Sequence, residues 1–152
     1  MLQLIKKTKR VYFPILSAFV LILSSFSLKP GGDSFEIYLN NKLIMQQYGS
    51  QMDAVKNLQL DQHLATDELL VKYHHCGKVG KERVIIIKDE QNNILKEWHF
   101  PNVSSADAGM NCSVKDILIL KKGNIRQVKL YYASAELPKG RLLASITFGT
   151  QQ

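Results

Sequence analysis

Short apolar runs alternate with turn-forming residues along the chain from residue 34 onward. The stretch SFEIYLNNKLIMQQY has two apolar-rich arms on either side of Asn40 and Asn41, and ERVIIIKDEQNNILKEWHF repeats this arrangement around Asn92 and Asn93. Asparagine tolerates the left-handed backbone conformation that tight hairpin turns require. Each stretch therefore predicts a β-hairpin with a two-residue turn.

The two-residue turns also predict which residues face each other across each hairpin. The expected pairs are Tyr38 with Leu43 and Ile37 with Ile44 in the first hairpin, and Lys88 with Glu97 and Asp89 with Lys96 in the second. Pairs of opposite charge across two strands are favourable. One face of the second hairpin would then hold Ile85, Ile87, Trp98 and Phe100.

Further strands are predicted along the rest of the chain. They are expected in DELLVKYHHC (from about Leu69 to His75), VKNLQL, VKDILILKK, IRQVKLYYAS and RLLASITFG. Gly123 and Asn124 form a hairpin-like break, and LPKG fits a type I turn with Pro138 at its second position and Gly140 at its fourth. No segment keeps apolar residues at helical spacing over three turns.

Seven or eight short strands with frequent turns are typical of an all-β protein. We expect an antiparallel β-sandwich, Ig-like or jelly-roll-like, that forms a single domain over residues 34–152. A small β-barrel is the alternative architecture.

The N-terminus indicates export. Lys6, Lys7, Lys9 and Arg10 precede the apolar run VYFPILSAFVLILSSF, and small residues precede a cleavage point after Ser27. A basic head followed by a short apolar run is typical of a secretory signal peptide. We expect residues 1–27 to be that signal peptide and residues 28–33 to be a short leader, with a periplasmic or extracellular mature protein. An uncleaved anchor is the alternative, and membrane contact is expected only through this segment.

Much of the positive charge belongs to this N-terminal segment. The chain has 20 basic and 13 acidic side chains, of which residues 28–152 carry 16 basic and 13 acidic ones. The remaining lysines and arginines are scattered. Because nucleic-acid affinity depends on clustered cations that release counterions, we expect no nucleic-acid partner.

The stretch VKYHHCGKVG contains the most reactive side chains of the chain. The whole chain has two cysteines, Cys76 in this stretch and Cys112 further on, and two cysteines of an exported protein usually pair. We therefore predict a Cys76–Cys112 disulfide, which would stabilise the fold by about 3–4 kcal/mol in the chain-entropy model.

A copper or zinc site that uses His74, Cys76 and His99 is the alternative. On a strand His74 and Cys76 would share one face while His75 points away, so the adjacent histidines make a poor chelate. Because the chain lacks established metal-ligand spacing, we expect neither a bound metal nor a cofactor.

No motif for catalysis occurs in the chain. A nucleophile elbow, a phosphate-binding glycine loop and an S-x-x-K sequence are all missing, which favours a non-enzymatic protein. Tyr131 and Tyr132 would lie on opposite faces of their strand, one in the core and one near the surface. We expect a binding or interaction module whose partner is a protein, a small molecule or a glycan of the cell envelope.

The basic N-terminus, the short leader and the stretches GGDSFEIYLNNKL and LPKGRLLASI resemble small, uncharacterised exported β-proteins of Bacteroidetes-type Gram-negative bacteria. This resemblance covers most of residues 28–152. It implies an exported location and assigns no functional residues.

Overall fold

The computed structural model describes residues 32–60, 66–105, 107–121 and 125–149. The predicted signal peptide, residues 1–27, lies outside these residues, as does the predicted leader up to residue 31. Both therefore stay predictions. None of the helices in the described part of the chain is long and apolar enough to span a membrane.

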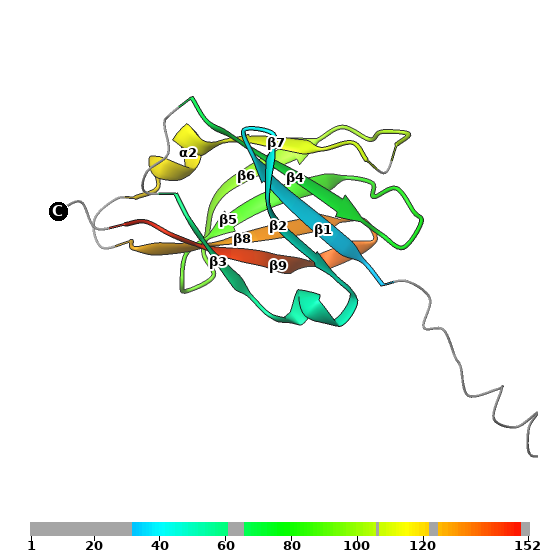
Figure 1. The fold of residues 1–152 in the computed structure, drawn as a ribbon, viewed down its shortest axis with the longest axis horizontal. Coiled ribbons are helices and arrows are strands. Elements are labelled where there is room, and N and C mark those ends of the chain that lie inside the picture. Colours follow the sequence, from blue (N-terminus) through cyan, green and yellow to red (C-terminus); the bar gives the residue numbers. More distant parts are fainter. Residues whose placement is uncertain (1–31, 61–65, 106, 122–124, 150–152) are drawn as a thin grey trace, which may run out of the picture. The chain divides into compact units, whose positions relative to one another are not determined.

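Two sheets pack against each other and form a β-sandwich, as predicted, in place of a closed barrel (Figure 1). The four-stranded sheet has the order β2 (Lys42–Tyr48), β1 (Ser34–Leu39), β4 (Glu68–His74) and β7 (Met110–Ser113). The five-stranded sheet has the order β3 (Lys56–Gln59), β9 (Leu137–Thr147), β8 (Gln127–Ser134), β5 (Arg83–Lys88) and β6 (Ile94–Phe100). The short helices are η1 (Gly49–Asp53) and α2 (Val114–Leu118).

The core lies between the sheets because apolar residues alternate along the central strands. Burial alternates strictly along β5 and β8, so that every second side chain faces the other sheet. Fully buried side chains from both sheets form one cluster, which includes Phe35, Ile37, Val71, Ile85, Ile87, Leu130 and Tyr132.

The first hairpin forms at the predicted turn. Asn40 and Asn41 both have positive φ, 49° and 64°, as a two-residue hairpin turn requires. The predicted pair of Tyr38 with Leu43 is confirmed. Ile37 faces Met45 in place of Ile44, because a bulge at this point adds one residue to β2.

The second hairpin forms with a different register. Ile85 faces Trp98 and Ile86 faces Glu97, so the predicted charge pairs of Lys88 with Glu97 and Asp89 with Lys96 are wrong. A shift of two residues preserves the side on which each residue lies. The predicted face of Ile85, Ile87, Trp98 and Phe100 therefore does turn toward the core.

Three local predictions are wrong. VKDILILKK begins with helix α2, whose Val114 and Ile117 are buried three residues apart on one helical face. LPKG lies at the start of strand β9 and is not a turn. β3 pairs with β9 in parallel, whereas the other strand pairs are antiparallel as expected.

Candidate functional site

The predicted disulfide between Cys76 and Cys112 is wrong, because the two cysteines are not bonded. Cys112 is buried on β7 and faces Leu69 of β4. Cys76 is exposed in the turn after β4, seven residues after Leu69. At about 3.3 Å per residue this separation is roughly 20 Å, whereas a disulfide needs Cα atoms within about 7 Å.

The alternative metal ligands are also not brought together. His74 ends β4 in the four-stranded sheet, and His99 lies on β6 in the five-stranded sheet. His99 is 72% exposed and lies 3.6 Å from Glu97. Within the described part of the chain, no three His, Cys, Asp or Glu side chains lie close enough together to hold a metal ion.

Among the histidines that the structure describes, His75 is the one that the fold places between the sheets. Leu69, Val71 and Tyr73 point into the core from β4, and the same alternation carries His75 inward, where it is 6% exposed. Its Nε2 lies 2.9 Å from the hydroxyl of Tyr132 and 3.2 Å from that of Ser134. Both partners belong to β8, so His75 connects one sheet with the other.

Two stacked tyrosines and an aspartate extend this contact. The rings of Tyr73 and Tyr132 stack with their centroids 4.2 Å apart. The Tyr73 hydroxyl donates a hydrogen bond of 2.8 Å to Asp33, whose carboxylate also lies 3.9 Å from His75 Nδ1. We call Asp33, Tyr73, His75, Tyr132 and Ser134 the inter-sheet cluster.

Burial raises the pKa of both phenols in the cluster. It raises the pKa of Tyr132, and burial together with the hydrogen bond to Asp33 raises the pKa of Tyr73. Tyrosine is neutral at physiological pH already, and the raised pKa values keep both phenols protonated into the alkaline range, so both hydroxyls can donate hydrogen bonds inside the cluster.

Gly80 covers the cluster from the loop after β4. A Cβ atom at this position would lie 2.5 Å from the Tyr132 hydroxyl and 2.9 Å from His75 Nε2. The loop is attached to the turn between β8 and β9, because the Lys81 N–H donates to Glu136 and the Lys81 carbonyl accepts from Ala135. Backbone therefore packs directly on the polar groups.

The cluster contains the residue types of a serine hydrolase triad. Ser134 Oγ and the Asp33 carboxylate approach opposite nitrogens of the His75 ring. In this geometry, however, Nε2 also contacts Tyr132, and Ser134 Oγ accepts the N–H of Leu137. A nucleophile must approach its substrate to about 3–3.5 Å, and these buried groups are engaged with each other under Gly80. The arrangement therefore connects the sheets and is not set up to attack a substrate.

The sequence interpretation selected His74 and Cys76 and missed His75. The signal that could have found it is the period-two alternation from Leu69, which predicts an inward side chain at position 75. Its partners could not have been found in this way, because Tyr132 and Ser134 come from the other sheet. The expectation that Tyr131 and Tyr132 lie on opposite faces is confirmed, since Tyr132 is buried while Tyr131 lies under Lys88 on the outer face.

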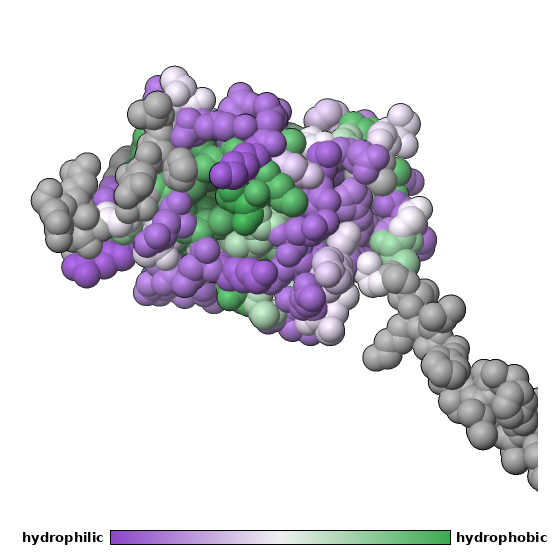
Figure 2. All heavy atoms as spheres, viewed as in Figure 1, coloured by the Kyte–Doolittle hydropathy of each residue, from purple (hydrophilic) through white to green (hydrophobic). Residues whose placement is uncertain are grey.

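The second unusual feature is the outer strand β2. Six large apolar side chains are exposed among the described residues, and three of them lie on β2: Leu43 (44%), Ile44 (38%) and Tyr48 (57%). Figure 2 shows apolar side chains gathered in the middle of one face, beside and over the strand that Figure 1 labels β2, with polar side chains around them. We call Leu43, Ile44 and Tyr48 the β2 edge.

The other outer strands differ from β2. β3 and β7 have four residues each, whereas β2 has seven. β6 carries Lys96, Glu97 and His99, and Lys96 forms an ion pair of 3.3 Å with Asp116 of α2. β2 carries one charged residue, Lys42 at its beginning. Short strands and charges are the usual protection against edge-to-edge pairing, and β2 has little of it.

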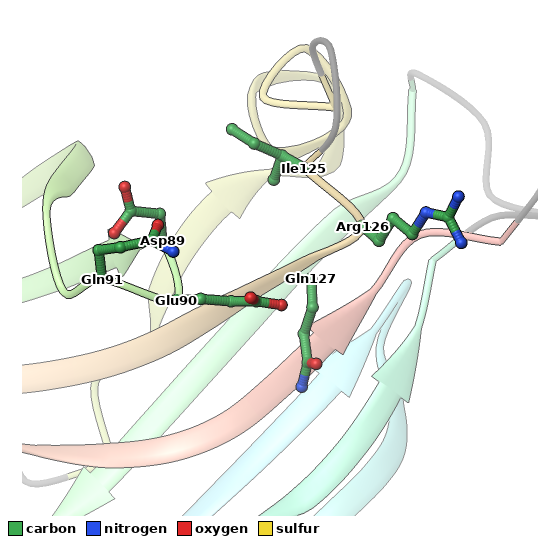
Figure 3. A pocket seen from close by; sticks show the side chains of 6 residues that line it. All are labelled: Asp89, Glu90, Gln91, Ile125, Arg126 and Gln127. Atoms are coloured by element: carbon green, nitrogen blue, oxygen red, sulfur yellow. The ribbon is translucent and has the colours of Figure 1, made fainter.

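A notch opens between the β5–β6 turn and the start of β8. It has a volume of about 330 Å³ and is lined by Asp89, Glu90, Gln91, Ile125, Arg126 and Gln127. Figure 3 shows that the Arg126 side chain extends away from Glu90. Asp89 accepts hydrogen bonds from the Asn93 side chain and backbone, which lower its pKa. The charged groups of the notch therefore do not converge on a common point.

No protein-family model matches this chain, and a search of curated proteins finds no match. The comparisons accordingly provide no indication of catalysis.

Proposed function

We propose that this protein is an exported, non-enzymatic β-sandwich that binds a protein partner of the cell envelope through β2. The observation that carries the proposal is the β2 edge, a long outer strand with three exposed apolar side chains and one charge. The N-terminal pattern of a basic head and a short apolar run supports the exported location.

A protein partner follows from the chemistry of an outer strand. Such a strand presents unpaired backbone N–H and C=O groups, which an extended segment of another protein can pair. The side chains of the β2 edge would add apolar contact, at about 25 cal/mol per Å² removed from water. Tyr48 combines a large ring with a polar hydroxyl, which makes tyrosine common at protein interfaces.

The inter-sheet cluster supports the non-enzymatic part of the proposal. Two buried residues whose types can do acid–base or nucleophilic work, His75 and Ser134, are engaged with each other, and Ser134 also accepts from the Leu137 N–H. Buried polar networks of this kind, when fully paired, make a core rigid and specific.

Site-specific photo-crosslinking in the native cell tests the proposal. A photoreactive phenylalanine analogue would replace Tyr48 or Leu43 on β2, or Ile94 on β6 as a control that is exposed to 55%. We expect covalent adducts with protein from positions 48 and 43 and none from position 94. Adducts of equal yield from all three positions, or from position 94 alone, would exclude β2 as the binding surface.

A further inference from the structure

We propose that the partner of β2 is a second copy of this chain, so that two β2 strands pair antiparallel and join two four-stranded sheets into one. This inference rests on the proposed function and identifies the partner for it. It follows from the distribution of charge around β2 and from its differences from the other outer strands.

The charges at the two ends of β2 are complementary to each other. Lys42 stands at the beginning of the strand, and the exposed Asp53 ends η1, which follows directly after Tyr48. When two copies pair antiparallel, Lys42 of each copy lies toward the η1 end of the other copy, where Asp53 is. Parallel pairing would bring the two copies of Lys42 together. Attraction at both ends therefore favours the antiparallel, two-fold arrangement.

The side chains between these ends are compatible with the same pairing. Between Lys42 and Tyr48 the strand has only uncharged residues, so no like charges oppose each other across a shared strand pair. Leu43, Ile44 and Tyr48 of both copies would lose contact with water along one seam. The bulge lies at the Lys42 end of β2, which leaves residues 45–48 in regular register.

The size of the contact predicts a weak dimer. A stable interface usually buries about 800 Å² on each partner, and a seven-residue strand with three exposed apolar side chains offers less. The dimer should therefore form as protein concentration rises and dissociate on dilution.

Sedimentation velocity over a range of concentrations tests the inference, with the protein purified from cells that express the full chain. The wild type should shift from monomer to dimer as the concentration rises. The double variant Leu43→Lys/Ile44→Lys should remain monomeric, because it adds four lysines to one seam. The matched control, Ile94→Lys/Ile119→Lys, changes two somewhat more exposed apolar residues outside β2 and should dimerise as the wild type does.

Charge reversal tests the orientation separately. Lys42→Asp and Asp53→Lys should each weaken dimerisation about threefold to tenfold, since each removes two surface ion pairs. The combined variant Lys42→Asp/Asp53→Lys should restore it, because the pair is then reversed. These positions are exposed, so the variants keep the fold.

Two results would overturn the inference: a wild type that stays monomeric at the highest concentration, or a dimer that the β2 variants leave unchanged. A monomeric wild type that still gives β2 crosslinks to a different protein in cells would exclude the second copy and leave the proposed function standing. A dimer insensitive to β2 variants, together with no β2 crosslinks, would exclude both.

Discussion

His75 comes directly after β4 in the chain, and the hydrogen-bond partners of its imidazole, Tyr132 and Ser134, lie on β8 of the other sheet. A buried polar side chain is costly without hydrogen bonds and well tolerated with them. His75 can form its hydrogen bonds only when the two sheets are placed correctly against each other. The inter-sheet cluster thus favours one alignment of the sheets over other alignments that would bury the same apolar area.

Replacing His75 by leucine should reveal this contribution. In this variant an apolar side chain fills the space of the imidazole. The hydroxyls of Tyr132 and Ser134 then lose His75 as their buried hydrogen-bond partner. We expect the free energy of unfolding to fall by about 1–3 kcal/mol. Urea denaturation followed by tryptophan fluorescence measures it. His99→Leu, at an exposed position, should change stability by less than about 0.5 kcal/mol, and an equal loss in both variants would contradict the prediction.

Gly80→Ala tests the cover over the cluster. The added methyl group would lie 2.5 Å from the Tyr132 hydroxyl, so the loop or the ring must move. We expect a loss of about 1–3 kcal/mol in thermal or urea denaturation. The double variant Gly80→Ala/Tyr132→Phe removes the closest atom and should lose less than the two single variants added together. Additive losses would show that the methyl group does not meet the Tyr132 hydroxyl.

At the level of elements, the turn of the first hairpin shows how two identical residues take different roles. The Asn40 side chain donates to Asp67 and accepts from the Glu68 N–H, which ties the turn to the start of β4. Asn41 shares the positive φ that the turn requires. A residue at such an angle is strained unless it is glycine, asparagine or aspartate.

Glycine substitutions separate these two roles. Asn41→Gly should be neutral or stabilise the protein by a few tenths of a kcal/mol, because glycine adopts positive φ more readily. Asn40→Gly gains the same freedom and loses two hydrogen bonds, so it should destabilise the protein by about 1 kcal/mol. Parallel urea titrations of the two variants measure the difference, and identical midpoints would refute the assigned roles.

For the whole molecule, buried groups with raised pKa values predict sensitivity to alkali. Burial raises the pKa of Cys112 from its ordinary value of 9.0 to about 12, and it also raises the pKa values of Tyr73 and Tyr132. As pH rises above about 9, these groups release protons in the unfolded chain but keep them in the folded one. The free energy of unfolding therefore falls with pH, at up to about 1.4 kcal/mol per pH unit for each group.

Urea midpoints measured between about pH 7 and about pH 10.5 should show this decline. Tyr132→Phe removes one of the three groups, so its stability should fall less steeply above pH 9 even though it starts lower at neutral pH. Ile94→Val changes an exposed side chain that does not titrate and should keep the wild-type slope. A midpoint that stays constant or rises over this range would contradict the prediction.

The strands and their faces could be predicted from the sequence to a large extent. The apolar runs predicted β4, β5 and β8 in the right places, and the hairpin pattern assigned Ile85, Ile87 and Trp98 to the core side. β9 was predicted in part, because it begins at Leu137, within the LPKG stretch that was expected to be a turn. The register between paired strands could be predicted less well from the sequence. The bulge near Ile44 and the hydrogen bond from the Asn93 N–H to Asp89 in the β5–β6 turn both reflect local backbone geometry. Such geometry leaves no periodic signal in the sequence.

The site could be predicted far less well. Cys76 and Cys112 were paired on the general behaviour of exported cysteines, whereas the antiparallel register of β4 with β7 sets them far apart. Helix α2 was missed because a five-residue helix is too short to display a helical period. Its formation depends on burial of Val114 and Ile117.

By itself, the sequence determined the secondary structure of most strands, the two-sheet architecture and the turn at Asn40 and Asn41, because these depend on alternation and on backbone preferences of single residues. Only the tertiary structure decided that His75 meets Tyr132 and Ser134 and that β2 is left as a long outer strand. Contacts between sheets and the order of strands depend on residues far apart in the chain, and no local pattern of apolar and polar positions encodes them.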